Sequence, residues 1–259
     1  MQESVFVERE GRIAHVVLNR PDRLNALDLA AWRRLGALME ELDGDGDLRC
    51  IIVRGMDSRA FAAGADISAF ARERADVEQA RIYGRTVHAA MAAVMRCRHP
   101  VVAAIEGVCV GGGLELACAC DLRIAGASAR FGVPIKKLGL TMAYGELRVL
   151  MDLVGPANAA EILLEGRIFG AERAREMGLL NRIVADGEVL AEARATAARI
   201  AEGAPLVARW HKKFIRRLLD PAPLTEAEIE EGFASLGTAD YRRGVEAFLA
   251  KREPEFRGD

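Results

Sequence analysis

The chain alternates between short apolar segments and longer segments in which apolar residues recur at helical spacing. Strand-like apolar segments lie at residues 13–18, 50–54, 101–105 and 121–125. Helical spacing covers residues 28–42 and 77–97, and the first of these begins at Asp28, a good N-cap residue. Residues 5–8 and 13–18 flank a Glu-Gly pair and predict a β-hairpin. Strands that alternate with helices predict an α/β fold with right-handed crossovers.

The C-terminal part has a different pattern, because strand-like segments disappear after about residue 185. Helical spacing continues at residues 189–202, 206–219, 226–236 and 241–251. We therefore expect a core over residues 1–200 and a helical C-terminal segment over residues 201–259. The helices of that segment have apolar faces of their own, so they are expected to pack on the core or on another subunit.

Composition and charge exclude several classes of protein. The 259 residues carry a net charge of −2, and their Arg and Lys side chains are dispersed, which argues against nucleic acid as the main partner. No apolar segment reaches the length of a membrane span, and the N-terminus lacks the features of a signal peptide, so a cytoplasmic protein is expected. The five cysteines and four histidines show no metal-ligand spacing, which predicts buried thiols and no metal site.

Two glycine-containing loops are candidates for a binding site, and each follows a predicted strand. The first is residues 61–67, FAAGADI, and the second is residues 107–115, GVCVGGGLE. Glycine permits close approach to the backbone, and a helix that opens on glycines presents free N–H groups and the positive end of its dipole. One such loop alone is explained equally well by tight packing between a helix and a strand. Neither loop has the spacing of a dinucleotide-binding or P-loop motif.

Together these loops, with the later FGVP at residues 131–134, resemble the crotonase (enoyl-CoA hydratase/isomerase) superfamily. The resemblance extends from the LNRPDRLNALD segment to the terminal AFLAKREPEF. It implies a crotonase-like ββα spiral core, an acyl-CoA substrate and a homotrimer or dimer of trimers. It implies no cofactor, because coenzyme A is part of the substrate. The helical C-terminal segment would then serve in oligomerisation.

The resemblance also assigns binding residues. Ala63 and Gly112 match the two N–H donors of an oxyanion hole, which stabilises the charge on the thioester oxygen of an enolate. The residues matched to coenzyme A or substrate binding lie in the LNALD lip, the first glycine loop and the tail: Arg23, facing phosphate, Asn25, Ala26, Gly64, Ala65, Asp66, Ile67, Phe233 and Lys251. The two tail residues, Phe233 and Lys251, match positions that often reach the coenzyme A of a neighbouring subunit.

Glu115 matches the first of the two glutamates that act on water and substrate in typical enoyl-CoA hydratases. A carboxylate in the apolar helix that follows the glycines needs a function or an ion-pair partner, and both alternatives stay open. The second glutamate of the family follows the proline of the FGxPE stretch, where this chain has Ile135. Ile135 lines the same pocket but cannot transfer a proton, so the usual two-glutamate mechanism is in question.

Glu146 is a carboxylate that the family pattern does not contain. It lies in a region that lines the acyl pocket of relatives, so it is a candidate for the missing acid; pairing with Arg148 or another cation at the surface is the alternative. Tyr144 is interpreted as a packed side chain. Four functions follow: an enoyl-CoA hydratase, a one-glutamate enoyl-CoA isomerase, a decarboxylase or thioester hydrolase of the family, or a CoA-binding protein with low activity.

The remaining histidines and basic residues are interpreted as structural. His88 and His99 are expected at the surface or at a helix end. His211 lies in a basic run, residues 209–217, which is typical of a solvated helix face.

Overall fold

A six-stranded sheet forms the centre of the computed structural model, which describes residues 3–259. Its strand order is β1-β2-β3-β5-β7-β10, and only the β1–β2 pair is antiparallel. The strands are β1 (Val5–Glu10), β2 (Ile13–Leu18), β3 (Cys50–Gly55), β5 (Val101–Ile105), β7 (Leu122–Gly126) and β10 (Arg182–Val184). The predicted hairpin and the α/β fold are therefore confirmed.

A second sheet of four short strands, in the order β4-β6-β8-β9, lies beside the first. Its strands are β4 (Ala60–Ala62), β6 (Val108–Val110), β8 (Arg130–Gly132) and β9 (Phe169–Gly170). Strands β4, β6 and β8 each follow a strand of the large sheet and precede a helix, so the chain repeats a ββα unit. The sequence predicted a loop from residue 61 to 66, which is wrong for its first two residues because three-residue strands are too short to show alternation.

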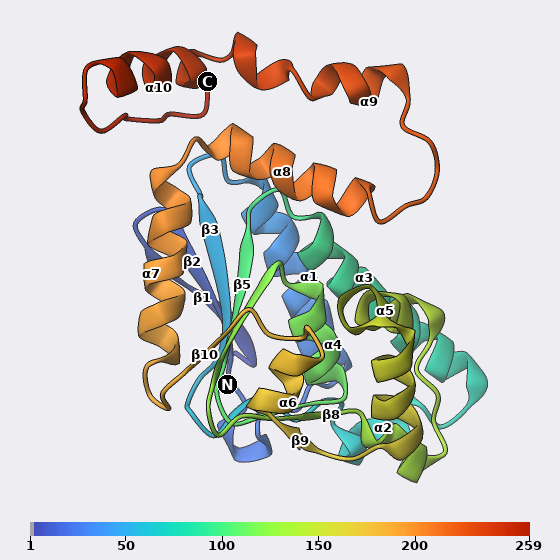
Figure 1. Cartoon of the computed structure of the whole chain (residues 1–259). Coiled ribbons are helices and arrows are strands. Elements are labelled where there is room, and N and C mark those ends of the chain that lie inside the picture. Colours follow the sequence, from blue (N-terminus) through green and yellow to red (C-terminus); the bar gives the residue numbers. More distant parts are fainter. Residues whose placement is uncertain (1–2) are drawn as a thin grey trace.

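Helices cover both faces of the large sheet (Figure 1). The helices of the core are α1 (Leu29–Gly44), α2 (Phe70–Glu73), α3 (Val77–Arg96), α4 (Gly112–Ala119), α5 (Tyr144–Ala160), α6 (Ala171–Glu176) and α7 (Val189–Glu202). Short helical turns lie at Pro21–Arg23, Ile67–Ala69, Pro134–Leu138 and Glu161–Glu165. Asp28 caps α1 as predicted, because its side chain accepts a hydrogen bond from the Ala31 N–H at 2.8 Å.

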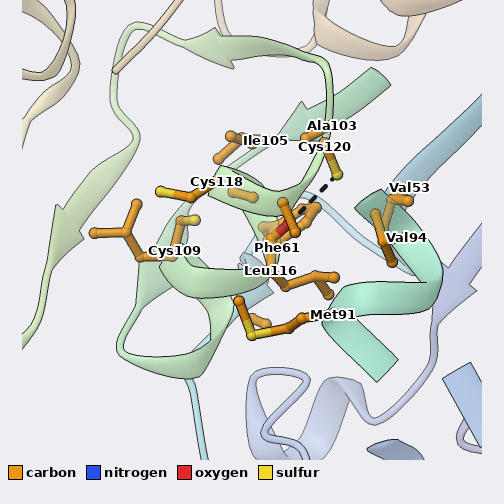
Figure 2. Close-up of a cluster of buried hydrophobic side chains, with 14 of the residues drawn as sticks. Val53, Phe61, Met91, Val94, Ala103, Ile105, Cys109, Leu116, Cys118 and Cys120 are labelled. Atoms are coloured by element: carbon orange, nitrogen blue, oxygen red, sulfur yellow. Dashed lines mark hydrogen bonds between the residues drawn. The ribbon is translucent and has the colours of Figure 1, made fainter. Parts of the chain in front are cut away.

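The main core lies between the large sheet and helices α1, α3 and α4, and a smaller one lies under α7. Figure 2 shows part of the main core, where Cys109, Cys118 and Cys120 lie among aliphatic and aromatic side chains. All five cysteines are free and buried, as predicted. Burial raises the pKa of the Cys118 and Cys120 thiols to about 12, so both behave as small hydrophobic residues.

Three helices, α8 (Pro205–Arg217), α9 (Glu226–Glu231) and α10 (Ala239–Leu249), form the C-terminal segment. Helix α8 lies across one end of the core, and α9 and α10 lie beyond it (Figure 1). The single helix predicted at residues 226–236 is wrong, because α9 ends at Glu231 and a separate helical turn covers Ala234–Gly237. The glycine at position 232 weakens helix propagation at that point.

Helix α8 is attached to the core through its basic side chains. Lys212 is buried, with Nζ 2.7 Å from an Asp121 carboxylate oxygen and 2.8 Å from the His99 carbonyl oxygen. Arg216 also binds Asp121, at 2.9 Å. The interpretation of residues 209–217 as a solvated face is therefore wrong for these two residues. The surface position expected for His99 is also wrong, since its side chain is fully buried; His211 is exposed.

Two searches of the described residues, 3–259, gave negative results. No helix in that range is both long and apolar enough to cross a membrane. The same residues contain no group of three or more His, Cys, Asp or Glu side chains arranged to hold a metal ion.

Candidate active site

The two glycine loops predicted from sequence lie in direct backbone contact. Gly64 has a φ of +95°, and a Cβ atom there would lie 2.8 Å from the Val110 carbonyl oxygen and 3.1 Å from the Gly112 nitrogen. A Cβ atom on Gly113 would lie 2.1 Å from the Ala62 carbonyl oxygen. Glycine is therefore required both for helix–strand packing, at Gly113, and for the approach of one loop to the other, at Gly64.

Two backbone N–H groups converge where the loops meet. The Leu27 N–H donates to the Gly64 carbonyl at 2.7 Å, and the Asp66 N–H donates to the Leu27 carbonyl at 3.0 Å. The N–H of Ala65, between them, therefore points away from Leu27, and its nitrogen lies 3.7 Å from the Cβ position of Gly112. Gly112 is the first residue of α4, so its N–H has no intrahelical acceptor. Such a pair of donors at a helix N-terminus favours an anionic oxygen.

The assignment of Ala63 to this donor pair is corrected by the structure. The Ala63 N–H donates to the Leu24 carbonyl oxygen at 2.9 Å, so this donor is already engaged. The positive φ of Gly64 changes the direction of the backbone after it, which leaves the Ala65 N–H on the side of α4. Of the two donors predicted from sequence, Gly112 stays a candidate, and Ala65 replaces Ala63.

The predicted lip of the site is a rigid turn. Leu24 and Asn25 have φ values of +49° and +55°. The buried Asn25 side chain accepts from the Arg20 N–H at 2.9 Å and donates to the Ala60 carbonyl at 2.8 Å. The Ala26 carbonyl accepts from the Arg20 side chain at 2.6 Å. Asn25 therefore shapes the lip from inside, and its side chain is already engaged in these hydrogen bonds.

The remaining candidate binding residues of the lip and the first glycine loop are of two kinds, buried and exposed. Asp66 is buried and accepts hydrogen bonds from Ser68 and from Arg20, the latter at 2.8 Å. These hydrogen bonds, first those of Ser68, hold the pKa of Asp66 below its usual value. Arg23 and Ile67 are exposed, and Arg23 lies 3.4 Å from the Ser68 hydroxyl. Arg23 and Ile67 are therefore accessible at the surface, whereas Asp66 is engaged with Arg20 and Ser68.

Glu115 lies one turn into α4 and is half-buried. Residues 3–259 contain no hydrogen-bond donor or ion-pair partner for its carboxylate, so the structural ion pair considered from sequence is not formed within them. Burial and, next in size, the negative charge of Glu146 raise the pKa of Glu115 to about 7, while Arg74 acts in the opposite direction. A carboxyl group with this pKa can both accept and donate a proton near neutral pH.

Glu146 lies in the first turn of α5 and is buried. Its Oε1 lies 2.8 Å from His88 Nε2 of α3. Its Oε2 is buried and has no hydrogen-bond partner in the described part of the chain. Of the surface pairings considered from sequence, the one with Arg148 is wrong, because Arg148 binds Asp152 at 2.8 Å, whereas pairing with another basic side chain occurs at His88. The structure therefore brings a second carboxylate into the electrostatic neighbourhood of Glu115.

Three other residues of this region were interpreted from sequence: Ile135, Tyr144 and His88. Ile135 is half-buried in the turn Pro134–Leu138 and packs against the main core. Tyr144, the first residue of α5, is 92% exposed, so its interpretation as a packed side chain is wrong. His88 is exposed, as expected, but its ion pair with Glu146 was missed, because a histidine on a helix surface gives no local signal of a partner on another helix.

The two tail residues expected to contact coenzyme A lie apart from this site. Phe233 and Lys251 are both exposed and flank the helices α9 and α10. These helices lie on the far side of α8 from α4 (Figure 1). Neither residue is therefore brought to Glu115 within one chain.

Comparison with known proteins identifies the family. A family model described as enoyl-CoA hydratase/isomerase matches residues 8–259. The chain belongs to the enoyl-CoA hydratase/isomerase family. Its relatives in this enzyme family include a probable enoyl-CoA hydratase of Rhizobium meliloti, which is 37% identical over 258 residues, with 98% of both chains covered. A crotonyl-CoA hydratase of Syntrophomonas wolfei is 32% identical over 256 residues, again with 98% of both chains covered.

Solved structures of this enoyl-CoA hydratase/isomerase family share the fold. The crystal structure of an enoyl-CoA hydratase/carnithine racemase from Magnetospirillum magneticum matches with a TM-score of 0.98 and 50% identity, covering 100% of this chain and 97% of that chain. An enoyl-CoA hydratase from Bacillus anthracis matches with a TM-score of 0.93 and 30% identity, covering 99% and 100%. The ββα spiral predicted from the resemblance is confirmed by these matches.

Proposed function

We propose that this enzyme adds water across the double bond of a short-chain enoyl-CoA thioester. The observation that carries the proposal is the juxtaposition of two buried or half-buried carboxylates, Glu115 and Glu146, whose charges interact. Family membership and relatives that are named enoyl-CoA hydratase support the substrate class. The reaction needs no group other than the substrate's own coenzyme A.

The N–H groups of Ala65 and Gly112 are proposed to bind the thioester carbonyl oxygen. This oxygen gains negative charge as the enolate forms, and two fixed donors at the start of α4 stabilise that charge more than they stabilise the neutral thioester. Removal of one donor from such a site typically costs about 3 kcal/mol in the barrier. Arg23, Ile67 and the backbone of Ala26 are proposed to contact the coenzyme A portion.

The two carboxyl groups are proposed to divide the proton transfers. One carboxylate takes a proton from water while the water oxygen bonds to the β carbon, and the electron pair of the double bond moves to form the enolate. A protonated carboxyl then donates its proton to the α carbon. Glu115, with a pKa of about 7, suits either part of this sequence. Glu146 is proposed to supply the carboxyl group that Ile135 does not provide.

A one-glutamate enoyl-CoA isomerase is the second candidate, and the apolar Ile135 favours it. In that reaction Glu115 alone would move one proton between two carbons of a dienolate held by the same N–H groups. Glu115 has no ion-pair partner among residues 3–259, so it is free to move a proton in this way. Glu146 would then serve only to raise the pKa of Glu115.

Product analysis separates the two candidates. Purified enzyme is incubated with crotonyl-CoA and, separately, with a 3-enoyl-CoA, and the products are identified by chromatography and mass spectrometry. The proposal predicts 3-hydroxyacyl-CoA from crotonyl-CoA. Conversion of the 3-enoyl-CoA to the 2-enoyl isomer without hydration of crotonyl-CoA would instead establish the isomerase.

The tail is proposed to assemble the chain into a homotrimer or a dimer of trimers. Phe248 is 82% exposed and lines a recess of about 380 Å³ together with other apolar side chains of α10, Val207 of α8 and Phe256, as well as polar residues such as Ser235 and Asp240. Exposed apolar area of this kind is typical of an oligomer interface. Light scattering on the wild type and on Phe248→Asp tests this proposal: we expect a multiple of three for the wild type and a smaller mass for the variant. The five free cysteines support a reducing, cytoplasmic location.

A further inference from the structure

The carboxylate of Glu146 is held at one oxygen and open at the other. His88 Nε2 lies 2.8 Å from Oε1, whereas Oε2 is buried and has no hydrogen-bond partner among residues 3–259. A buried oxygen without a donor costs on the order of 1–3 kcal/mol, so it is a strong acceptor for any donor that reaches it. A water molecule or a substrate group beside Glu115 would be such a donor.

Three helices converge on this carboxylate. His88 comes from α3, Glu115 from α4 and Glu146 from α5, and α4 packs against both of the other helices. Arg74, at the end of α2, is close enough to lower the pKa of Glu115 and lies over the Tyr83 ring at 3.7 Å. The groups that determine the charge at this place are therefore two carboxylates, one imidazole and one guanidinium.

The orientation of the imidazole is fixed by the start of α5. A Cβ atom on Gly145 would lie 3.6 Å from His88 Nε2 and 3.7 Å from Cδ2, so the ring rests against the backbone of the residue before Glu146. Glu146 lies in the first turn of α5, where the free N–H groups of the helix favour a negative charge. His88 Nε2 and Glu146 Oε1 are 2.8 Å apart, so the imidazole is in direct contact with this carboxylate.

We infer that His88 is a positioning residue for Glu146: through its 2.8 Å contact with Oε1, it directs Oε2 toward the water or acyl group on which Glu115 acts. This inference rests on the hydratase function proposed above. It explains how a carboxylate at position 146 can replace one at position 135, because a side chain from a different helix needs its own support to reach the reacting carbons. In this arrangement His88 does not contact the reacting water or the substrate.

The test compares His88→Ala, His88→Gln and His211→Ala, each alone and in the Glu146→Gln background. His211 is an exposed histidine of α8 and serves as the matched control. Steady-state hydration of crotonyl-CoA gives kcat and KM, and thermal unfolding checks that each variant is folded. Loss of positioning typically lowers turnover on the order of 10- to 100-fold. We expect this loss in kcat for His88→Ala, with KM within about twofold of wild type.

Two further results distinguish positioning from a structural role. His88→Gln, whose amide can donate to Oε1, should recover much of the kcat lost in His88→Ala. In the Glu146→Gln background, His88→Ala should cause no additional loss, because the two residues act as one unit. His211→Ala should leave kcat unchanged in each background, relative to the same protein with His211 intact.

Three outcomes would overturn the inference. Full activity of His88→Ala together with loss of activity in Glu146→Gln would show that the carboxylate works without the imidazole. Additive losses would show that His88 acts elsewhere. Full activity of Glu146→Gln would show that the reaction does not need the carboxylate that His88 is inferred to position. Hydration that depends on Glu115 would be unaffected by that result. A wild type that hydrates no enoyl-CoA would overturn the proposed function itself.

Discussion

Replacement of Glu115 by Gln should make the protein more stable and less active. The pKa of Glu115 is raised from 4.5 to about 7, first by burial and then by the charge of Glu146. Because the folded-state pKa lies above the unfolded value, the folded protein binds more protons between these two pH values, and stability falls as pH rises through this interval. At about 1.4 kcal/mol per pH unit, the total loss is about 3 kcal/mol as an upper limit.

Glutamine keeps the size of the side chain and has no charge to bury. The variant therefore does not lose stability as the pH rises from 4.5 to about 7. We expect Glu115→Gln to match the wild type in free energy of unfolding near pH 4.5 and to exceed it by up to about 3 kcal/mol above pH 7. Turnover should fall on the order of 10²-fold or more, as is typical for the loss of a general acid–base group. Stability gained at the expense of activity is common for catalytic residues.

Urea unfolding of the wild type and the variant at several pH values measures this difference. Protein concentration is held constant, since assembly makes apparent stability concentration-dependent. Glu41→Gln is the control, because Glu41 is an exposed glutamate of α1. A gain that does not change with pH, or a variant that is less stable than wild type at pH 8, would refute the reasoning. Wild-type turnover in Glu115→Gln would refute the catalytic role.

Three further predictions concern the backbone at the start of α4 and the attachment of α8 to the core. Gly112→Pro removes one N–H donor and should lower kcat on the order of 10²- to 10³-fold, whereas Gly112→Ala keeps the donor; equal kcat in the two variants would contradict the oxyanion site. Gly113→Ala places a Cβ atom 2.1 Å from the Ala62 carbonyl oxygen and should destabilise the protein in thermal unfolding. Gly84→Ala is the control in α3, because a Cβ atom there has no neighbour within 4 Å, and it should stabilise the protein by about 0.5–1 kcal/mol. Lys212→Ala should lower the free energy of unfolding by about 1–3 kcal/mol in urea; a loss near zero would show that the buried ion pair contributes nothing.

The sequence predicted the long elements of the fold well, because each carries many residues with one periodicity. The strands β1, β2, β3, β5 and β7 of the large sheet and the helices α1 and α3 follow from local patterns of this kind, whereas the three-residue strand β10 was missed. The small sheet was missed because its strands have only two or three residues. The burial of Lys212 was missed because a basic helix face is usually solvated, and its partner Asp121 lies 91 residues away along the chain.

The candidate site was predicted in its composition but not in its hydrogen bonds. The contact between the two glycine loops followed from the family resemblance, and glycine geometry explains it. The exchange of Ala63 for Ala65 as a donor could not be predicted, because it depends on the φ of Gly64. The pairing of His88 with Glu146 depends on the packing of two helices, which no local pattern determines.

The most direct test of the central claim is the rate of crotonyl-CoA hydration by Glu146→Gln and by Ile135→Glu, relative to the wild type. If Glu146 supplies the second carboxyl group, Glu146→Gln should lower kcat on the order of 10²-fold or more, and Ile135→Glu should add little or interfere. Wild-type kcat in Glu146→Gln together with a large increase in Ile135→Glu would contradict the account, because the position after Pro134 would then be the one from which a carboxylate reaches the water.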